Sequence, residues 1–160
     1  MIPPVLTPFF LQEFVNVEAK RQLHLTKSYL PSAILRGVYK LISLQIHRIN
    51  KAASSFRFFS PFGNIYREAE GAKEVVSLAA QFGEGWLLPA EIVSMMREGV
   101  KNVISLQPFG CIANHIVAKG IENALRKIDP ELNFLSLDFD SGVSNVNVSN
   151  RLLLFIDSMA

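Results

Sequence analysis

The segment "NVISLQPFGCIANHIVAKGIENALRKIDPELNFLSLDF", residues 102–139, decides the fold class. Residues 102–107 form a β-branched and leucine run typical of a buried strand, and residues 134–139 form a second such run. Between them, apolar residues recur at helical spacing over residues 113–128, until Pro130 ends the pattern. This order predicts a βαβ unit with parallel strands and a right-handed connection. We therefore expect an α/β fold with a small parallel sheet in the C-terminal half.

Helices are predicted on both sides of this unit. Apolar spacings of three, four and seven predict helices over residues 32–54 and 64–82, then over residues 88–98, and a last helix follows residue 143. The stripe expected to be buried on the first helix consists of Ile34, Val38, Leu41, Ile42, Ile49 and Ala52. The stretch "VLTPFF", residues 5–10, is expected to add one more strand. The whole predicts a single α/β domain over residues 1–160, with N-terminal helices flanking the sheet.

Composition excludes several classes of protein. Half of the 160 residues are hydrophobic, enough for one domain with a real core. The 16 Lys and Arg residues nearly balance 14 Asp and Glu residues, so no strong field draws in nucleic acid or anionic membrane. No apolar run approaches the length needed to span a bilayer, and no signal peptide is apparent. With a single cysteine, the sequence predicts a soluble protein of the reducing cytoplasm.

Cys111 lies where the first strand gives way to the helix. In open parallel sheets, ligand sites lie outside the carboxyl ends of the strands, here the loops of residues 107–115 and 138–144. A cysteine at a helix entry is near unpaired backbone N–H groups, which favour the thiolate that binds metal or attacks electrophiles. The alternative is an inert, buried cysteine that acts as a small hydrophobe.

Other polar residues leave further alternatives open. His115 follows Cys111 by four residues, but one such pair is too few ligands for a closed zinc site. A Cys111–His115 nucleophile is a further alternative, although two positions on one helix rarely give the required opposed geometry. Glu84 stands between two glycines as an acid over the site or as a turn tip, and Asp138 and Asp140 are cation ligands or caps.

Three segments resemble one family: "GEGWLLPAEIV" (residues 83–93), "NVISLQPFGCIANHIVAKGI" (102–121) and "LDFDSGVSNVNVSNRLLLF" (137–155). Together they look like the C-terminal region of proteins related to 2-hydroxyacyl-CoA dehydratases and CoA-substrate-specific enzyme activases. The match continues upstream through "EGAKEVVSLAAQFGEGW" (70–86) and covers most of the chain. The chain departs from the pattern at Ala113 and Ser141, where the family usually has proline.

The resemblance implies a module of a longer polypeptide in which cysteines at strand ends hold a [4Fe–4S] or related cluster. Cys111 is then one ligand, and because a cluster needs several thiolates, this chain alone binds none. Gln107, Asn114 and His115 line the pocket, Gly110 lets the backbone approach, and Glu84 lies on a neighbouring loop. In the family, an ATP-dependent activator drives a low-potential electron through the cluster to a CoA thioester, which loses water.

The partners implied are the remainder of the parent polypeptide or the activator, with a CoA thioester as substrate and homo-oligomer formation left open. Two other functions remain as alternatives. One is a non-catalytic docking domain that uses the phenylalanine-rich residues 56–62 and the long helices, with an inert cysteine. The other is an independent α/β enzyme with Cys111 as nucleophile.

Overall fold

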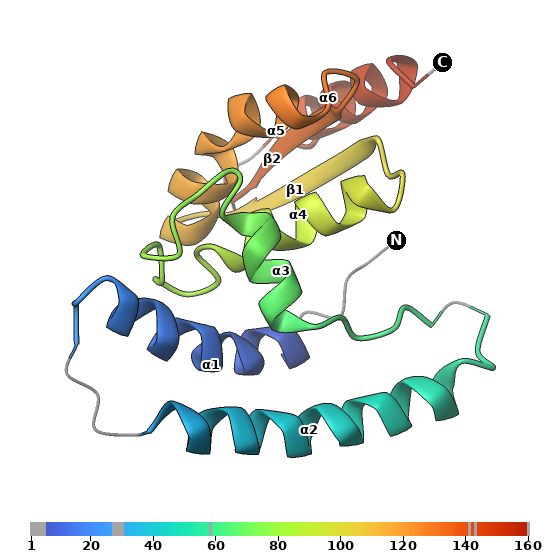
Figure 1. Cartoon of the computed structure of the whole chain (residues 1–160). Coiled ribbons are helices and arrows are strands. Elements are labelled where there is room, and N and C mark those ends of the chain that lie inside the picture. Colours follow the sequence, from blue (N-terminus) through green and yellow to red (C-terminus); the bar gives the residue numbers. More distant parts are fainter. Residues whose placement is uncertain (1–5, 27–30, 58, 141, 143, 160) are drawn as a thin grey trace.

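The computed structural model describes residues 6–26, 31–57, 59–140, 142 and 144–159. Val5, Phe58 and Ser141, on which part of the sequence analysis rests, lie outside them. The elements, shown in Figure 1, are α1 (Leu6–Gln22), α2 (Ser32–Ala53), α3 (Ile65–Ala72), α4 (Leu87–Arg97), β1 (Asn102–Pro108), the π-helix η1 (Ala113–Ala118), α5 (Glu122–Ile128), β2 (Asn133–Phe139) and α6 (Asn145–Asp157).

The predicted βαβ unit is present. β1 and β2 are parallel neighbours, with Asn102 opposite Asn133 and Pro108 opposite Phe139. η1 and α5 connect them, so the α/β class with a small parallel sheet is confirmed. Side chains of β1 alternate between a buried and an exposed face, as the pleat requires. Because the strands are parallel, their carboxyl ends meet at one edge of the sheet.

One face of the sheet carries the C-terminal core. α4, η1 and α5 cover this face, with Val93, Val117 and Leu125 packed against Val103 and Phe134 of the strands. α6 lies along β2, where Phe155 is buried and its main-chain oxygen accepts a hydrogen bond from the Asn133 amide. These helices therefore hold the amino-terminal halves of both strands in place.

The N-terminal helices form a second core beneath this layer (Figure 1). Trp86, which is 0% exposed, donates a hydrogen bond from its indole nitrogen to Asn16 Oδ1 over 2.7 Å. This bond joins α1 to the start of α4, because a buried indole N–H needs a partner. α2 runs below α1 and contacts it through Arg36, which pairs with Glu18 at 2.7 Å, and through Tyr39.

The strand expected at residues 5–10 is wrong, because Leu6 already begins α1. Leu11, Val15 and Ala19 recur every four residues and are all buried, so one helical face anchors the segment. Pro8 is tolerated because it lies in the first turn, where its missing N–H costs no helical hydrogen bond.

The helix expected over residues 64–82 ends early, at Ala72. Its buried positions Ile65, Ala69 and Ala72 are as predicted, but the chain then turns instead of continuing. The Ser77 hydroxyl accepts a hydrogen bond from the Ala79 N–H, a local alternative to a helical bond. The turn places Leu78 in the N-terminal core, a position that the helical periodicity did not predict.

Two further helix predictions need correction. On α2 the packed face is rotated: Tyr39, Ile42 and Ile46 contact the core, whereas most of the predicted stripe, such as Leu41 at 66%, is exposed. Edge-to-face contacts of the Tyr39 ring with Phe14 and Tyr66 select this face. The single helix expected over residues 113–128 is divided into η1 and α5.

No helix within the described residues combines the length and the apolar character that crossing a bilayer would require.

Candidate functional site at the carboxyl ends of the strands

A tight turn places Cys111 at the carboxyl edge of the sheet. Gly110 has a φ of 76°, which favours glycine, and the Cys111 N–H donates to the Pro108 main-chain oxygen over 3.2 Å. The space around Gly110 is open, so it is the backbone conformation that demands glycine here. The Phe109 N–H donates to the Phe139 oxygen over 2.9 Å and ties the turn to the end of β2.

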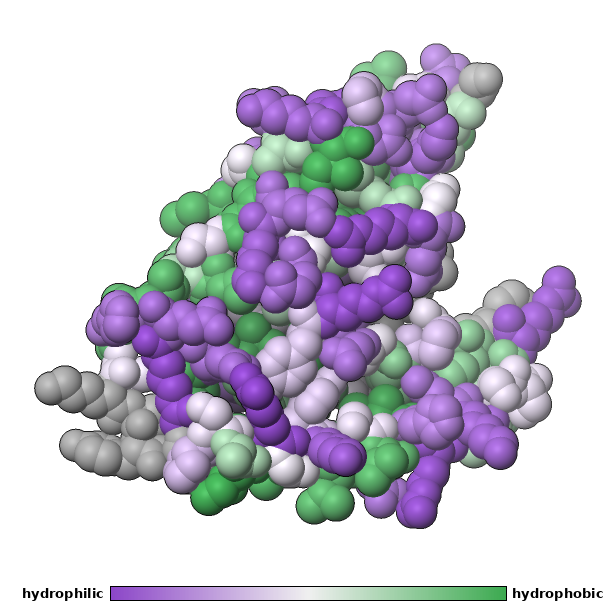
Figure 2. All heavy atoms as spheres, viewed as in Figure 1, coloured by the Kyte–Doolittle hydropathy of each residue, from purple (hydrophilic) through white to green (hydrophobic). Residues whose placement is uncertain are grey.

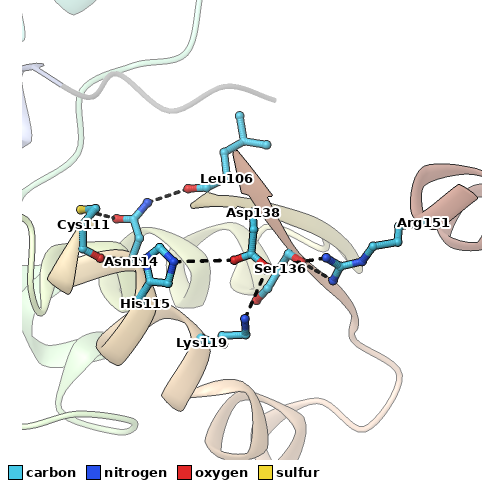
Figure 3. A network of polar contacts seen from close by, with 8 residues as sticks. All are labelled: Leu106, Cys111, Asn114, His115, Lys119, Ser136, Asp138 and Arg151. Carbon is cyan, nitrogen blue, oxygen red and sulfur yellow. Dashed lines mark hydrogen bonds and ion pairs between the residues drawn. The ribbon is translucent and has the colours of Figure 1, made fainter. Parts of the chain in front are cut away.

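The Cys111 side chain lies half-buried at the rim (Figure 3). Its sulfhydryl donates to Asn114 Oδ1 over 3.5 Å, and Asn114 Nδ2 donates to the Leu106 main-chain oxygen over 2.6 Å. The asparagine therefore holds the thiol close to the carboxyl end of β1. Asn114, which the family resemblance alone had placed near Cys111, is in direct contact with it.

His115 links the two loops. Its Nδ1 lies 3.1 Å from the Cys111 main-chain oxygen, and its Nε2 lies 3.8 Å from Asp138 Oδ1 (Figure 3). The first contact assigns the proton to Nδ1, because a carbonyl oxygen only accepts. Both ring nitrogens are thus directed away from the Cys111 sulfur. This arrangement does not form the thiol–imidazole pair that a cysteine nucleophile requires.

Asp138 is the centre of a small charged cluster. Lys119 Nζ lies 3.6 Å and Arg151 Nη1 lies 3.8 Å from its Oδ2, in addition to His115 at Oδ1. Arg151 Nη2 also donates a hydrogen bond to the Ser136 main-chain oxygen over 2.5 Å. Sequence reasoning considered Asp138 but missed both cations. Lys119 could have been found from the sequence, because it follows His115 by four residues and so lies on the same helical face. Arg151 reaches the cluster only because α6 folds along β2.

Gln107 lies beneath this cluster on the covered face of the sheet. It is 0% exposed, and neither polar atom of its side chain has a hydrogen-bond partner within the described residues. The neighbouring strand places Asp138 directly opposite, with a buried Oδ1 that also lacks a hydrogen bond, and buried Ser136 Oγ is in the same condition. Buried polar atoms are normally hydrogen-bonded, so these two strand ends depart from the usual pattern.

Glu84 is not part of this cluster of contacts. It lies in the loop before α4, and its charge acts on Glu91, whose pKa is raised to about 7 by burial first and then by Glu68 and Glu84. The loop itself does approach η1, because a Cβ at Gly83 would lie 3.8 Å from that of Ala113. The structure therefore assigns Glu84 to a separate acidic group beside α4.

Among the described residues, no set of three or more His, Cys, Asp or Glu side chains is placed to hold a metal ion. A complete [4Fe–4S] site therefore does not fit this part of the chain by itself. Cys111 presents one sulfur at the rim, whereas a cluster needs several thiolates.

Searches against protein-family models, curated proteins and solved structures gave no match for this chain.

Proposed function

We propose that this chain supplies one thiolate, Cys111, to an iron–sulfur cluster whose other ligands come from another polypeptide segment. The supporting observation is the position of the sulfur, half-buried at the carboxyl edge of a parallel sheet, where ligands bind in such folds. The resemblance to proteins related to 2-hydroxyacyl-CoA dehydratases and activases supplies the chemistry: a low-potential electron for dehydration of a CoA thioester.

The residues around Cys111 have distinct roles in this proposal. Asn114 orients the sulfur by accepting its S–H, a bond that is lost when the thiol gives up its proton to bind iron. Lys119 places positive charge at the rim beside Asp138, as an anionic cluster or a CoA ester requires, and His115 lies next to the same carboxylate. Gln107 supplies unused polar atoms below them. The lone cysteine fits a reducing cytoplasm, which we infer as its compartment.

A second function, a docking domain, is favoured by α2. None of its residues is fully buried, and Leu41 and Leu44 of its outer face are more than half exposed. Figure 2 shows apolar residues along the lower edge of the molecule, where α2 lies in Figure 1. An exposed apolar face of this kind marks an interaction surface. Docking and cluster binding are compatible, because the cluster needs a second polypeptide segment.

Ligand exchange with a synthetic [4Fe–4S] cluster that carries small thiolates tests the cluster proposal on this chain itself. Under anaerobic conditions, Cys111 is expected to displace one small thiolate, so that cluster iron co-elutes with the protein in gel filtration. The matched control moves the thiol to an exposed site at the end of α2, in the double variant Cys111→Ser with Ser54→Cys. We expect this control to retain much less iron. Equal retention by wild type and Cys111→Ser, or by wild type and the relocated cysteine, would contradict the proposal.

A further inference from the structure

The edge of β1 that faces away from β2 carries free hydrogen-bonding groups. Asn133 N–H donates to the Lys101 oxygen and Phe109 N–H donates to the Phe139 oxygen. Backbone groups of successive residues in a strand point to opposite edges, so the odd-numbered residues of β1 face β2. The even-numbered Asn102, Ile104 and Leu106 therefore direct their N–H and C=O groups to the outer edge.

Within the described residues, one of these outward groups has a partner. The Leu106 oxygen accepts from Asn114 Nδ2, a side-chain cap at the carboxyl end of the edge. No described strand pairs with the remainder of the edge, since the sheet consists of β1 and β2. Parallel sheets are normally larger and covered on both faces, whereas Ile104 and Leu106 here are 40% and 56% exposed. An edge of this kind is a template for strand pairing.

A groove runs beside this edge. It has a volume of about 310 Å³ and lies between β1 and the exposed flank of α4. Its lining includes apolar side chains at helical spacing on α4, then Val100 of the following loop and the strand itself: Leu88, Ile92 and Met95, then Val100 and residues 102–106. A strand added to the edge would direct every second side chain into this groove.

The groove also contains an acid without a partner. Glu91 lines it, and the Glu91 Oε1 atom is buried with no hydrogen bond within the described residues. Glu68 and Glu84 are close enough to oppose its ionisation. A cation brought into this apolar groove would stabilise the Glu91 carboxylate, which burial and the two neighbouring acids otherwise disfavour, so the groove favours an occupant with a basic side chain.

From this geometry we propose that the outer edge of β1 binds an extended polypeptide segment as a third strand. Its backbone pairs with Ile104 and its neighbours, its alternate apolar side chains fill the groove, and a lysine or arginine reaches Glu91. A second copy of this chain is a poorer occupant, because pairing β1 with itself about a two-fold axis would bring two Glu91 carboxylates to one interface. The inference does not depend on Cys111 or on a cluster.

Hydrogen exchange measured by NMR on the whole chain tests the proposal. The probe is a blocked valine–threonine peptide with one central lysine, as long as β1. Without peptide, the Ile104 amide is expected to exchange faster than Ser105, whose amide faces β2. With peptide at about ten times its dissociation constant, Ile104 exchange should slow about tenfold while Ser105 is little changed. Absence of slowing at Ile104, or slowing on β2 or α2 instead, overturns the proposal.

Three controls separate strand addition from unspecific contact. A peptide with N-methyl groups on one edge loses its ladder donors and should not protect Ile104. Replacement of the peptide lysine by glutamate, or the variant Glu91→Gln, should weaken binding about tenfold, whereas Glu98→Gln at the exposed end of α4 should leave it unchanged. Equal binding by either altered peptide overturns the proposal. Protection of Ile104 that rises with protein concentration, without peptide, also overturns it and identifies a second copy as the occupant.

Discussion

Asn114 Nδ2 donates a hydrogen bond to the main-chain oxygen of Leu106 over 2.6 Å, and thereby joins η1 to the outer edge of β1. The same asparagine accepts the Cys111 S–H through its other polar atom. One side chain therefore completes the strand edge and positions the thiol. Its counterpart on the other edge of the sheet is Arg151, which donates to the Ser136 oxygen.

Replacement of Asn114 is expected to loosen the Cys111 turn more than the fold. In Asn114→Ala, water replaces the amide at the exposed edge, so the free energy of unfolding should fall by only about 1 kcal/mol. The rate of Cys111 alkylation by iodoacetamide should rise, because the sulfur loses its restraint. Asn123→Ala, at an exposed position of α5, is the control for both measurements. An unchanged alkylation rate in Asn114→Ala would show that Asn114 does not restrain the thiol.

Glu91 should make the stability of the chain fall between about pH 4.5 and pH 7. Its pKa in the fold is about 7, raised from 4.5 by burial and by Glu68 and Glu84, so the fold favours the protonated carboxyl. The stabilisation is complete below pH 4.5 and is lost as the pH rises through 7. Glu91→Gln should match wild type at pH 4.5 and exceed it by roughly 2 to 3 kcal/mol at pH 8. Urea denaturation at several pH values between 4.5 and 8 measures the free energy of unfolding, with Glu98→Gln as the control. The same pH dependence in wild type and Glu91→Gln would contradict the prediction.

Gly85 should tolerate no side chain. A Cβ at Gly85 would clash with the Ala80 main-chain oxygen. The same oxygen accepts a hydrogen bond from the main-chain N–H of Trp86 over 2.8 Å. Gly85→Ala is therefore expected to cost about 3 kcal/mol of unfolding free energy. Gly37→Ala is the opposite case, because nothing lies within 4 Å of that position on α2. It should stabilise α2 by about 1 kcal/mol. Thermal unfolding of both variants tests the contrast, and a harmless Gly85→Ala would disprove the clash.

Arg151 is expected to fasten α6 to β2. Arg151→Met keeps the apolar stem but removes the bond to the Ser136 oxygen and the ion pair with Asp138. Loss of a charged donor to a main-chain acceptor should cost about 1 to 2 kcal/mol, and amides of α6 should exchange faster. Lys127→Met, at an exposed position of α5, should change neither measurement by more than about 0.5 kcal/mol. Equal effects of the two substitutions would show that Arg151 acts only as surface charge.

Part of the candidate site was predictable from local pattern. The two strand ends and the turn that carries Cys111 follow from short apolar runs and from Pro108 and Gly110. Asn114 and His115 come near Cys111 because they follow it in one helical turn. Local pattern did not predict the bond between Arg151 and Ser136, or that the buried Gln107 side chain lacks hydrogen-bond partners. They depend on how α6 and η1 pack on the sheet, and no local pattern encodes that packing.

The amino-acid sequence alone specified the α/β class, because alternation of strand-like and helix-like periodicity leaves few parallel arrangements. It also specified the location of the thiol at a strand end. Which face of α2 packs inward, where α3 stops, and that residues 5–10 are helical were settled by packing in three dimensions. The reason is that an apolar side chain stabilises the fold through the area that it buries, and the neighbours that bury it are distant along the chain, as Tyr66 is for Tyr39. The same holds for the buried hydrogen bond between Trp86 and Asn16.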